Sequence, residues 1–317
     1  MEGVDASSIG IWGVPLAVLG GAIRISTPFL FVSLGECITE KSGRVNLGLE
    51  GTLVMGAMSG YGVSYLTGSA WLGVIAASAI GALLGALHGY LCGRPRVNDI
   101  AVGIAMMLFG IGLAFFLGKP LIQPSAPRLP SIPFGFLSDS PQVRSALEVN
   151  VLFLVGLALA PALRWALANT RSGMVLRVVG EGSEAARAMG YDVLKVRLLA
   201  TVAGGALAGI GGSFLSLFYP GSWNEGLSSG QGLMAVALVI FARWEPMRCL
   251  YASLLFGGAS ALGPALQSVG VTSGYYLFNA APYALTLLIM VLSSSATEAS
   301  ADMPAELTAT RRLGAHS

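Results

Sequence analysis

Charged residues are scarce in this chain of 317 residues. Only 11% are Asp, Glu, Lys or Arg, whereas a soluble domain carries roughly 25%. Hydrophobic residues make up 54% and the mean hydropathy is +0.73. This balance excludes an ordinary soluble globular domain and predicts an all-α polytopic membrane protein with about 9–10 transmembrane helices. The net charge of +2 gives no indication of nucleic-acid binding.

Several sequence signatures of catalysis are also missing. The chain has no Gly-x-x-x-x-Gly-Lys-Ser/Thr phosphate-binding loop and no HExxH motif. Its three cysteines, Cys37, Cys92 and Cys249, are isolated, so neither a disulfide framework nor a metal site is indicated. We therefore expect a chain that is not an enzyme and that holds no cofactor or metal of its own.

Long apolar runs fill most of the sequence, and a span of the bilayer needs about twenty such residues. We interpret the whole chain, 1–317, as one membrane domain with its core at 12–293. The candidate spans are 12–35, 48–66, 70–92, 99–118, 148–167, 198–218, 229–243, 249–267 and 275–293. The proline-rich stretch 119–147 cannot be a spanning helix and is expected to form the largest external loop.

The basic residues lie in alternate loops, at 41–44, 94–96, 164–197 and 243–248. The positive-inside rule places these loops and the C-terminus in the cytoplasm, with a disordered tail at 297–317. The direction of the first span is open. Straight counting puts the N-terminus outside, whereas a broken helix near 36–50, which we favour, puts it inside. Pro28 is expected to interrupt the first helix.

One charge-rich segment, 169–197, interrupts the apolar runs and is expected to form a cytoplasmic loop. Within it, residues 184–190 predict a short surface helix: Ser183 suits its N-cap, Glu184 its positive end and Gly190 its C-terminal end. A helix this short has no core of its own and is stable only against another surface.

The same segment carries a resemblance to a known family. Glu-Ala-Ala, three residues and then Gly, at 184–190, resembles the coupling signature of the permeases of ABC importers. Three further stretches resemble the branched-chain amino acid/ribose-type group of these permeases: RISTPFL at 24–30, EKSGRVNLGLEG at 40–51 and AVALVIFARWEP at 235–246. Within that group the chain looks most like the shorter permease of nucleoside or simple-sugar importers that use a basic-membrane-protein-type receptor.

The resemblance implies a bacterial inner-membrane subunit that forms a heterodimer with a second, homologous permease. An ATP-binding subunit, which would hold ATP and magnesium, would bind below it, and an extracytoplasmic receptor lipoprotein would deliver the substrate. The coupling residues implied by the motif are Glu184, Ala185, Ala186 and Gly190. Met189 and Tyr191 are bulkier than the small residues expected at their positions.

Polar residues inside the apolar runs are candidates for a translocation pathway, because such residues are costly in lipid unless they face protein or water. The candidates are Glu36, Asn46, Glu50, Asn98, Trp223 and Gln231. Simpler roles are open for several: Glu50 as a partner of Arg44, the neighbouring Asp99 as a helix cap, and Trp223 as an interfacial aromatic residue. The alternative to an importer subunit is a self-sufficient secondary transporter, which would need ion-coupling carboxylates such as Glu36 and Glu50.

Overall fold

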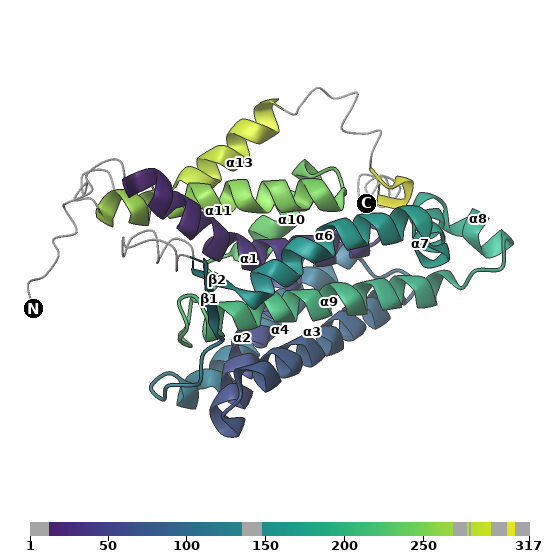
Figure 1. The fold of residues 1–317 in the computed structure, drawn as a ribbon. Helices are drawn as coiled ribbons and strands as arrows, with labels where there is room; N and C mark the ends of the chain where they lie inside the picture. Colours follow the sequence, from purple (N-terminus) through teal and green to yellow (C-terminus); the bar gives the residue numbers. More distant parts are fainter. Residues whose placement is uncertain (1–12, 135–147, 269–277, 279, 293–302, 308–317) are drawn as a thin grey trace, which may run out of the picture.

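The fold is described by a computed structural model for residues 13–134, 148–268, 278, 280–292 and 303–307. It is a bundle of long helices with one small two-stranded sheet at one end (Figure 1). The longer helices are α1 (Gly13–Lys41), α2 (Leu49–Thr67), α3 (Ala70–Cys92), α4 (Asp99–Gly118), α6 (Val151–Asn169), α9 (Val193–Leu217) and α11 (Pro246–Ser268). The shorter ones are η2 (Lys119–Leu121), α7 (Arg171–Glu181), α8 (Ser183–Ala188), α10 (Gln231–Phe241) and α13 (Ala281–Leu292).

The expected all-α polytopic class is confirmed. Among the described residues, six helices are long and apolar enough to cross a membrane: α1, α3, α4, α6, α9 and α11. The expected span at 48–66 corresponds to α2, and that at 229–243 to α10, which has only 11 residues. Of the expected span at 275–293, residues 281–292 form α13, whereas 275–277 and 279 lie outside the described residues.

Helix α9 is the centre of the bundle and packs against α1, α2 and α3, while α1 also packs along α11. Small residues allow the backbones to approach closely. A Cβ atom added at Gly81 of α3 would collide with the carbonyl oxygen of Gly205 in α9, and one at Gly209 with that of Ala77. Contacts of this kind hold helices together in lipid, where burial of apolar surface gives little driving force between them.

The expected interruption of the first helix is wrong. Helix α1 continues through Pro28 to Lys41, so residues 36–41 are helical and only 42–48 separate α1 from α2. Proline disturbs the carbonyl groups of the preceding turn. The carbonyl that loses its helical donor to Pro28 is that of Arg24, while the hydroxyls of Ser26 and Thr27 donate to the carbonyl of Ile23, at 3.2 and 3.0 Å. Membrane helices tolerate proline where neighbouring helices support them, and α1 packs against α9 and α11.

The continuous α1 also decides the direction of the first span relative to the rest of the bundle. Near its end, Lys41 packs against Gly180 of α7. In its first half, Arg24 pairs with Glu148 of β2 at 3.8 Å. Strands β1 (Ser131–Pro133) and β2 (Glu148–Asn150) pair antiparallel, with Ile132 opposite Val149. Helix α1 therefore starts at the end of the bundle opposite to α7 and α8. The N-terminus itself, which we favoured on the side of the charge-rich loop, belongs to residues 1–12, which lie outside the described residues.

The predicted disordered tail is corrected in one part. Residues 303–307 include a short helical turn, and Leu307 is 7% exposed. These residues lie beside α7 and α8 in Figure 1. The other residues of the predicted tail, 297–302 and 308–317, lie outside the described part of the chain.

Candidate functional site

The charge-rich segment 169–197 forms α7, α8 and the first turn of α9. Thr170 caps α7 by accepting a hydrogen bond from the Gly173 N–H at 3.1 Å, and Asp192 caps α9 in the same way from Lys195. Helix α8 begins at Ser183, after Gly182, and has no side-chain cap. The expected capping role of Ser183 is therefore wrong; its backbone N–H instead donates to the carboxylate of Glu306 at 2.8 Å.

Helix α8 ends at a left-handed glycine, as the sequence predicts. Gly190 has φ +85°, a conformation that costs glycine little. The Gly190 N–H donates to the carbonyl of Arg187, and the Tyr191 N–H to that of Ala186. This pair of bonds is the Schellman motif, which satisfies carbonyls that the helix leaves open. The left-handed Gly190 thus lets the chain change direction directly after the six-residue helix α8.

The implied coupling residues do not form one face of α8. Ala186 is fully buried and belongs to a small apolar cluster with Val179 of α7 and Val193 of α9. Glu184, Ala185 and Gly190 are exposed, and so is Met189, at 57%. Ala185, Ala186 and Met189, the apolar residues of the motif, therefore do not share one face. Ala186 instead fixes α8 to the bundle, while the other two remain on the surface.

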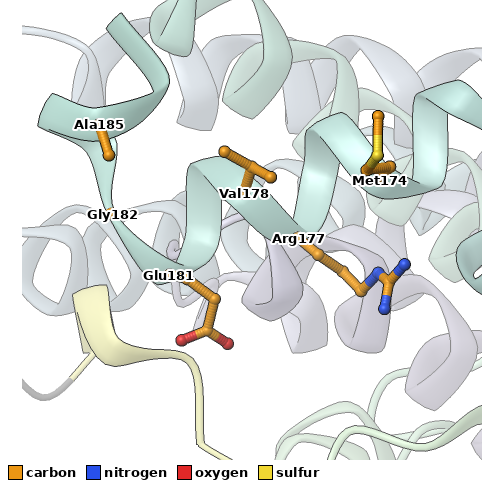
Figure 2. A pocket seen from close by; sticks show the side chains of 6 residues that line it. All are labelled: Met174, Arg177, Val178, Glu181, Gly182 and Ala185. Atoms are coloured by element: carbon orange, nitrogen blue, oxygen red, sulfur yellow. The ribbon is translucent and has the colours of Figure 1, made fainter. Parts of the chain in front are cut away.

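A hollow of about 440 Å³ lies where α8 meets α7. Figure 2 shows the six residues that line it: Met174, Arg177, Val178, Glu181, Gly182 and Ala185. The hollow combines apolar side chains with one charge of each sign. It is a surface that could receive a protruding part of another protein.

Two pathway candidates, Glu36 and Asn46, are brought together at the turn between α1 and α2. The backbone N–H of Asn46 donates to Glu36 Oε1 at 2.7 Å, and Asn46 Oδ1 accepts from the Gly48 N–H at 2.9 Å. Both side chains are buried. Within the part of the chain that the structure describes, Glu36 Oε2 has no hydrogen-bond partner.

Two other candidates, Glu50 and Gln231, meet at the start of α10. Glu50 accepts from the Ser228 hydroxyl at 2.5 Å, the Gly230 N–H at 3.1 Å and the Gly232 N–H at 2.6 Å. The carboxylate therefore satisfies the N–H groups of Gly230, the residue before α10, and of Gly232 in its first turn. In the described residues, the buried Oε1 of Gln231 has no partner. The suggested pairing of Glu50 with Arg44 is wrong, because Arg44 binds Asp99.

The last two candidates are occupied by structural hydrogen bonds. Asn98, and not Asp99, caps α4 by accepting from the N–H groups of Ile100 and Ala101. Trp223 is 1% exposed, and its indole N–H donates to the Gly118 carbonyl at 2.8 Å. It is therefore a buried anchor for the end of α4, and the suggested interfacial position is wrong.

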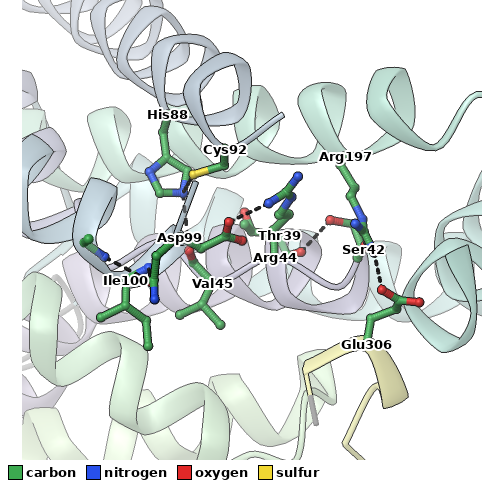
Figure 3. A network of polar contacts seen from close by, with 12 residues as sticks. Thr39, Ser42, Arg44, Val45, His88, Cys92, Asp99, Ile100, Arg197 and Glu306 are labelled. Carbon is green, nitrogen blue, oxygen red and sulfur yellow. Dashed lines mark hydrogen bonds and ion pairs between the residues drawn. The ribbon is translucent and has the colours of Figure 1, made fainter. Parts of the chain in front are cut away.

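The turn at residues 42–48 is held by a polar network drawn in Figure 3. Arg44 pairs with Asp99 at 2.5 Å, His88 Nε2 donates to the Val45 carbonyl at 3.2 Å, and Arg197 Nε donates to the Ser42 carbonyl at 3.0 Å. The turn is thereby tied to α3, α4 and α9. Arg197 also pairs with Glu306 at 3.0 Å.

Sequence reasoning missed Arg197 and Glu306 as partners. They stand 109 residues apart, and Glu306 lies in a polar stretch whose composition suggests disorder. Burial raises the pKa of the Glu306 carboxyl, but hydrogen bonds from Ser183 and Arg197 outweigh it and hold the pKa below its usual value of 4.5. The carboxylate is thus stabilised in its charged form.

Six helices among the described residues are long and apolar enough to cross a membrane, which defines a multi-pass membrane protein. Residues 18–294 match the family model of the branched-chain amino acid transport system permease component. The chain belongs to this family, which confirms the resemblance seen in the sequence.

Three relatives match over most of their length. The first, named "Putative glucose ABC transporter permease protein TsgC13" in Haloferax volcanii, is 36% identical over 80% of this chain and 79% of its own. The guanosine ABC transporter permease protein NupQ of Bacillus subtilis is 31% identical over 86% of this chain and 90% of its own. The nucleoside ABC transporter permease protein NupC of Lactococcus lactis is 28% identical over 87% of this chain and 91% of its own.

Proposed function

We propose that this chain is the permease subunit of an ATP-binding cassette importer that moves a nucleoside or a related simple sugar into the cytoplasm. The names of the three relatives support the transport class and the substrate class. The structural observation that carries the proposal is α8, a short helix fixed by Ala186 and ended by Gly190, with Glu184 and Ala185 exposed beside a hollow. A short, exposed helix that is fixed to the bundle is what we expect where a partner protein docks.

The partner ATPase would bind at α7 and α8 and would hold the ATP and magnesium; this chain would supply no catalytic residue. A second, homologous permease would complete the pathway as a heterodimer, and an extracytoplasmic receptor would deliver the substrate. The proposed cellular location of the protein is a bacterial inner membrane. Residues 303–307 contact α8, so they would lie with α8 in the cytoplasm, and we propose the same side for the C-terminus.

The pathway is proposed to pass the turn at 42–48 and the start of α10. Glu36 and Gln231 each bring a buried polar atom without a partner among the described residues, and a buried polar atom left unpaired is costly. A hydroxyl-rich substrate such as a nucleoside or a sugar could satisfy both atoms in passing. Asn46 and Glu50 shape the two backbone segments beside them.

The test of the coupling role compares substitutions in α8. Gly190→Pro removes an N–H that closes the helix and forbids the positive φ, whereas Gly190→Asn keeps the N–H and tolerates that φ. We expect Gly190→Pro and Glu184→Ala to abolish uptake of radiolabelled nucleoside in a deletion strain at unchanged membrane levels. Gly190→Asn should retain most of the uptake. Normal uptake by Gly190→Pro would refute the coupling role.

The test of the pathway uses Gln231→Ala, which removes an amide whose oxygen has no partner in the described structure. We expect a KM for uptake raised about tenfold, since one substrate hydrogen bond is worth about 1.4 kcal/mol. Association with the ATPase should be unchanged. An unaltered KM would place the pathway elsewhere.

A further inference from the structure

Residues 303–307, which we name the C-terminal clamp, touch parts of the chain that are distant in sequence. Leu307 is 7% exposed and belongs to the apolar cluster that includes Trp244 and Cys249, and Met303 packs against the same cluster. The segment is therefore anchored to the bundle by apolar burial, in addition to its polar contacts.

The polar contacts of the clamp reach the two short helices of the charge-rich loop. Glu306 Oε1 accepts from the backbone N–H of Ser183, the first residue of α8, at 2.8 Å. The N–H of Ala305 donates to Glu181 Oε2, at the end of α7, at 3.4 Å. The clamp thus meets the chain on both sides of Gly182, where α7 passes into α8.

The other oxygen of Glu306 reaches the membrane helices. Glu306 Oε2 accepts from Arg197 Nη2 of α9 at 3.0 Å, as Figure 3 shows, and Arg197 Nε donates to the Ser42 carbonyl at 3.0 Å. A Cβ atom added at Gly43 would lie 2.8 Å from the Cβ of Glu306, so the turn after α1 lies directly against the clamp. One carboxylate therefore joins α8 to α9 and to the end of α1.

A displacement of α8 can move the bundle only if α8 is firmly joined to the membrane helices. Helix α8 has six residues, and Ala186 is its one buried residue; a helix this short has little stability of its own. Without a second attachment, a force on α8 would be absorbed by bending at Gly182. Hydrogen bonds to a charged group are about twice as strong as neutral ones, so the Glu306 contacts oppose that bending.

We propose that the C-terminal clamp transmits displacement of α8 to α9 and α1, with Glu306 as the positioning residue that links them. The inference rests on the proposed function, in which a partner ATPase acts on α8. A carboxylate suits this role because its two oxygens accept from Ser183 and Arg197 at once. A glutamine has a single acceptor oxygen and must turn its NH₂ group toward one of the two donors.

The first test measures the clamp itself, on the full-length chain in detergent, by amide hydrogen exchange. Glu306→Gln should speed exchange of the amides at 183–190 roughly tenfold, which corresponds to the loss of one charge-assisted bond. Exchange in α3, which the clamp does not contact, is the internal control. Glu306→Asp, which keeps the charge on a shorter side chain, should give an intermediate rate. Unchanged exchange in both variants would overturn the proposal.

The second test measures transmission, in the complex with its ATPase reconstituted in liposomes. Glu306→Gln should reduce nucleoside taken up per ATP hydrolysed about fivefold or more, the lower range of typical coupling effects. A merely structural role would lower the amount of complex and leave this ratio unchanged. Arg197→Gln should lower the ratio as well, and the double variant should be no worse than the more severe single one, since the two side chains form one ion pair.

The two readouts separate the clamp from the proposed function. Absence of ATP-driven uptake in the unmodified complex would contradict the importer function, while the exchange experiment would still decide whether Glu306 holds α8. A wild-type uptake ratio in Glu306→Gln, together with active wild-type transport, would overturn transmission through the clamp.

Discussion

Glu50 lies at the start of α10, where the sequence provides no cap of its own. The residue before α10 is Gly230, which has no side chain to accept the open N–H groups. Glu50 of α2, which is distant in sequence, takes this role, because its carboxylate accepts hydrogen bonds from three donors. The charge also suits the positive end of a helix. A residue expected to line the pathway therefore holds the start of α10 in place.

Replacement of Glu50 by alanine should destabilise the protein. The change leaves two buried donors, the Ser228 hydroxyl and the Gly232 N–H, and the partly buried Gly230 N–H without an acceptor. Each buried unsatisfied group costs about 1–3 kcal/mol. We expect a loss of about 3 kcal/mol or more, measured as a lower midpoint of thermal unfolding in detergent. Glu225→Ala is the matched control, because Glu225 is an exposed carboxylate in the same connection, 218–230. Equal midpoints for the two variants would contradict the capping role.

The lowered pKa of Glu306 makes a prediction about pH. Because the folded-state pKa lies below the usual 4.5, the charged form stabilises the fold. This contribution is fully present above pH 4.5 and is lost as the pH falls through the lowered value. The difference in thermal midpoint between the wild type and Glu306→Gln should be constant from pH 7 to about 4.5 and shrink below it. A difference that grows on acidification would show that the sign is wrong.

At the scale of elements, the pairing of α3 with α9 explains a similarity within the sequence. Residues 81–91 and 205–215 both read as strings of Gly, Ala and Leu, a pattern that an inverted repeat or chance could produce. The two helices are antiparallel, because Gly81 faces Gly205 whereas Gly85 faces Thr201. Both stretches contribute small residues to one interface. Close packing requires small residues on both helices, which explains their similar composition.

This interface should not tolerate a methyl group. Gly81→Ala would place its Cβ against the Gly205 carbonyl, and forced overpacking costs typically about 1–3 kcal/mol. We expect a lower thermal midpoint and a smaller monodisperse fraction on size-exclusion chromatography after heating. Gly112→Ala in α4 is the control: its Cβ would meet nothing within 4 Å, and alanine is the better helix former. A Gly81→Ala protein as stable as this control would refute close packing.

Local patterns in the sequence were sufficient for α8 and its end. A left-handed glycine and a short polar helix are determined by neighbouring residues, and both are found at 183–190. Pro28 does not end α1, because the helix is packed along α9 and α11, and neighbouring helices let a membrane helix tolerate proline. The Glu306 junction could not be predicted, since nothing near Glu306 indicates Ser183 or Arg197 as partners. Trp223 shows the same limit: its partner, Gly118, is 105 residues away.

For the whole molecule, the two ends of the bundle carry different structures. At one end lie α7, α8, the turn at 42–48 and the clamp, joined by the Arg44–Asp99 and Arg197–Glu306 ion pairs. At the other end lie the β1–β2 pair and the Arg24–Glu148 ion pair. All four basic clusters, at 41–44, 94–96, 164–197 and 243–248, lie at the first end, which agrees with one common side for them. An importer subunit needs this division, with an ATPase on one side and a receptor on the other.

The most direct test of this account is purification of the tagged chain from native membranes, with identification and stoichiometry of the proteins that accompany it. We predict an ATP-hydrolysing subunit and a second permease, both held in fixed ratio, and ATP-dependent nucleoside or sugar uptake when the purified complex is placed in liposomes. A chain that purifies alone and still transports its substrate without ATP would contradict the account. It would identify the protein as a secondary transporter.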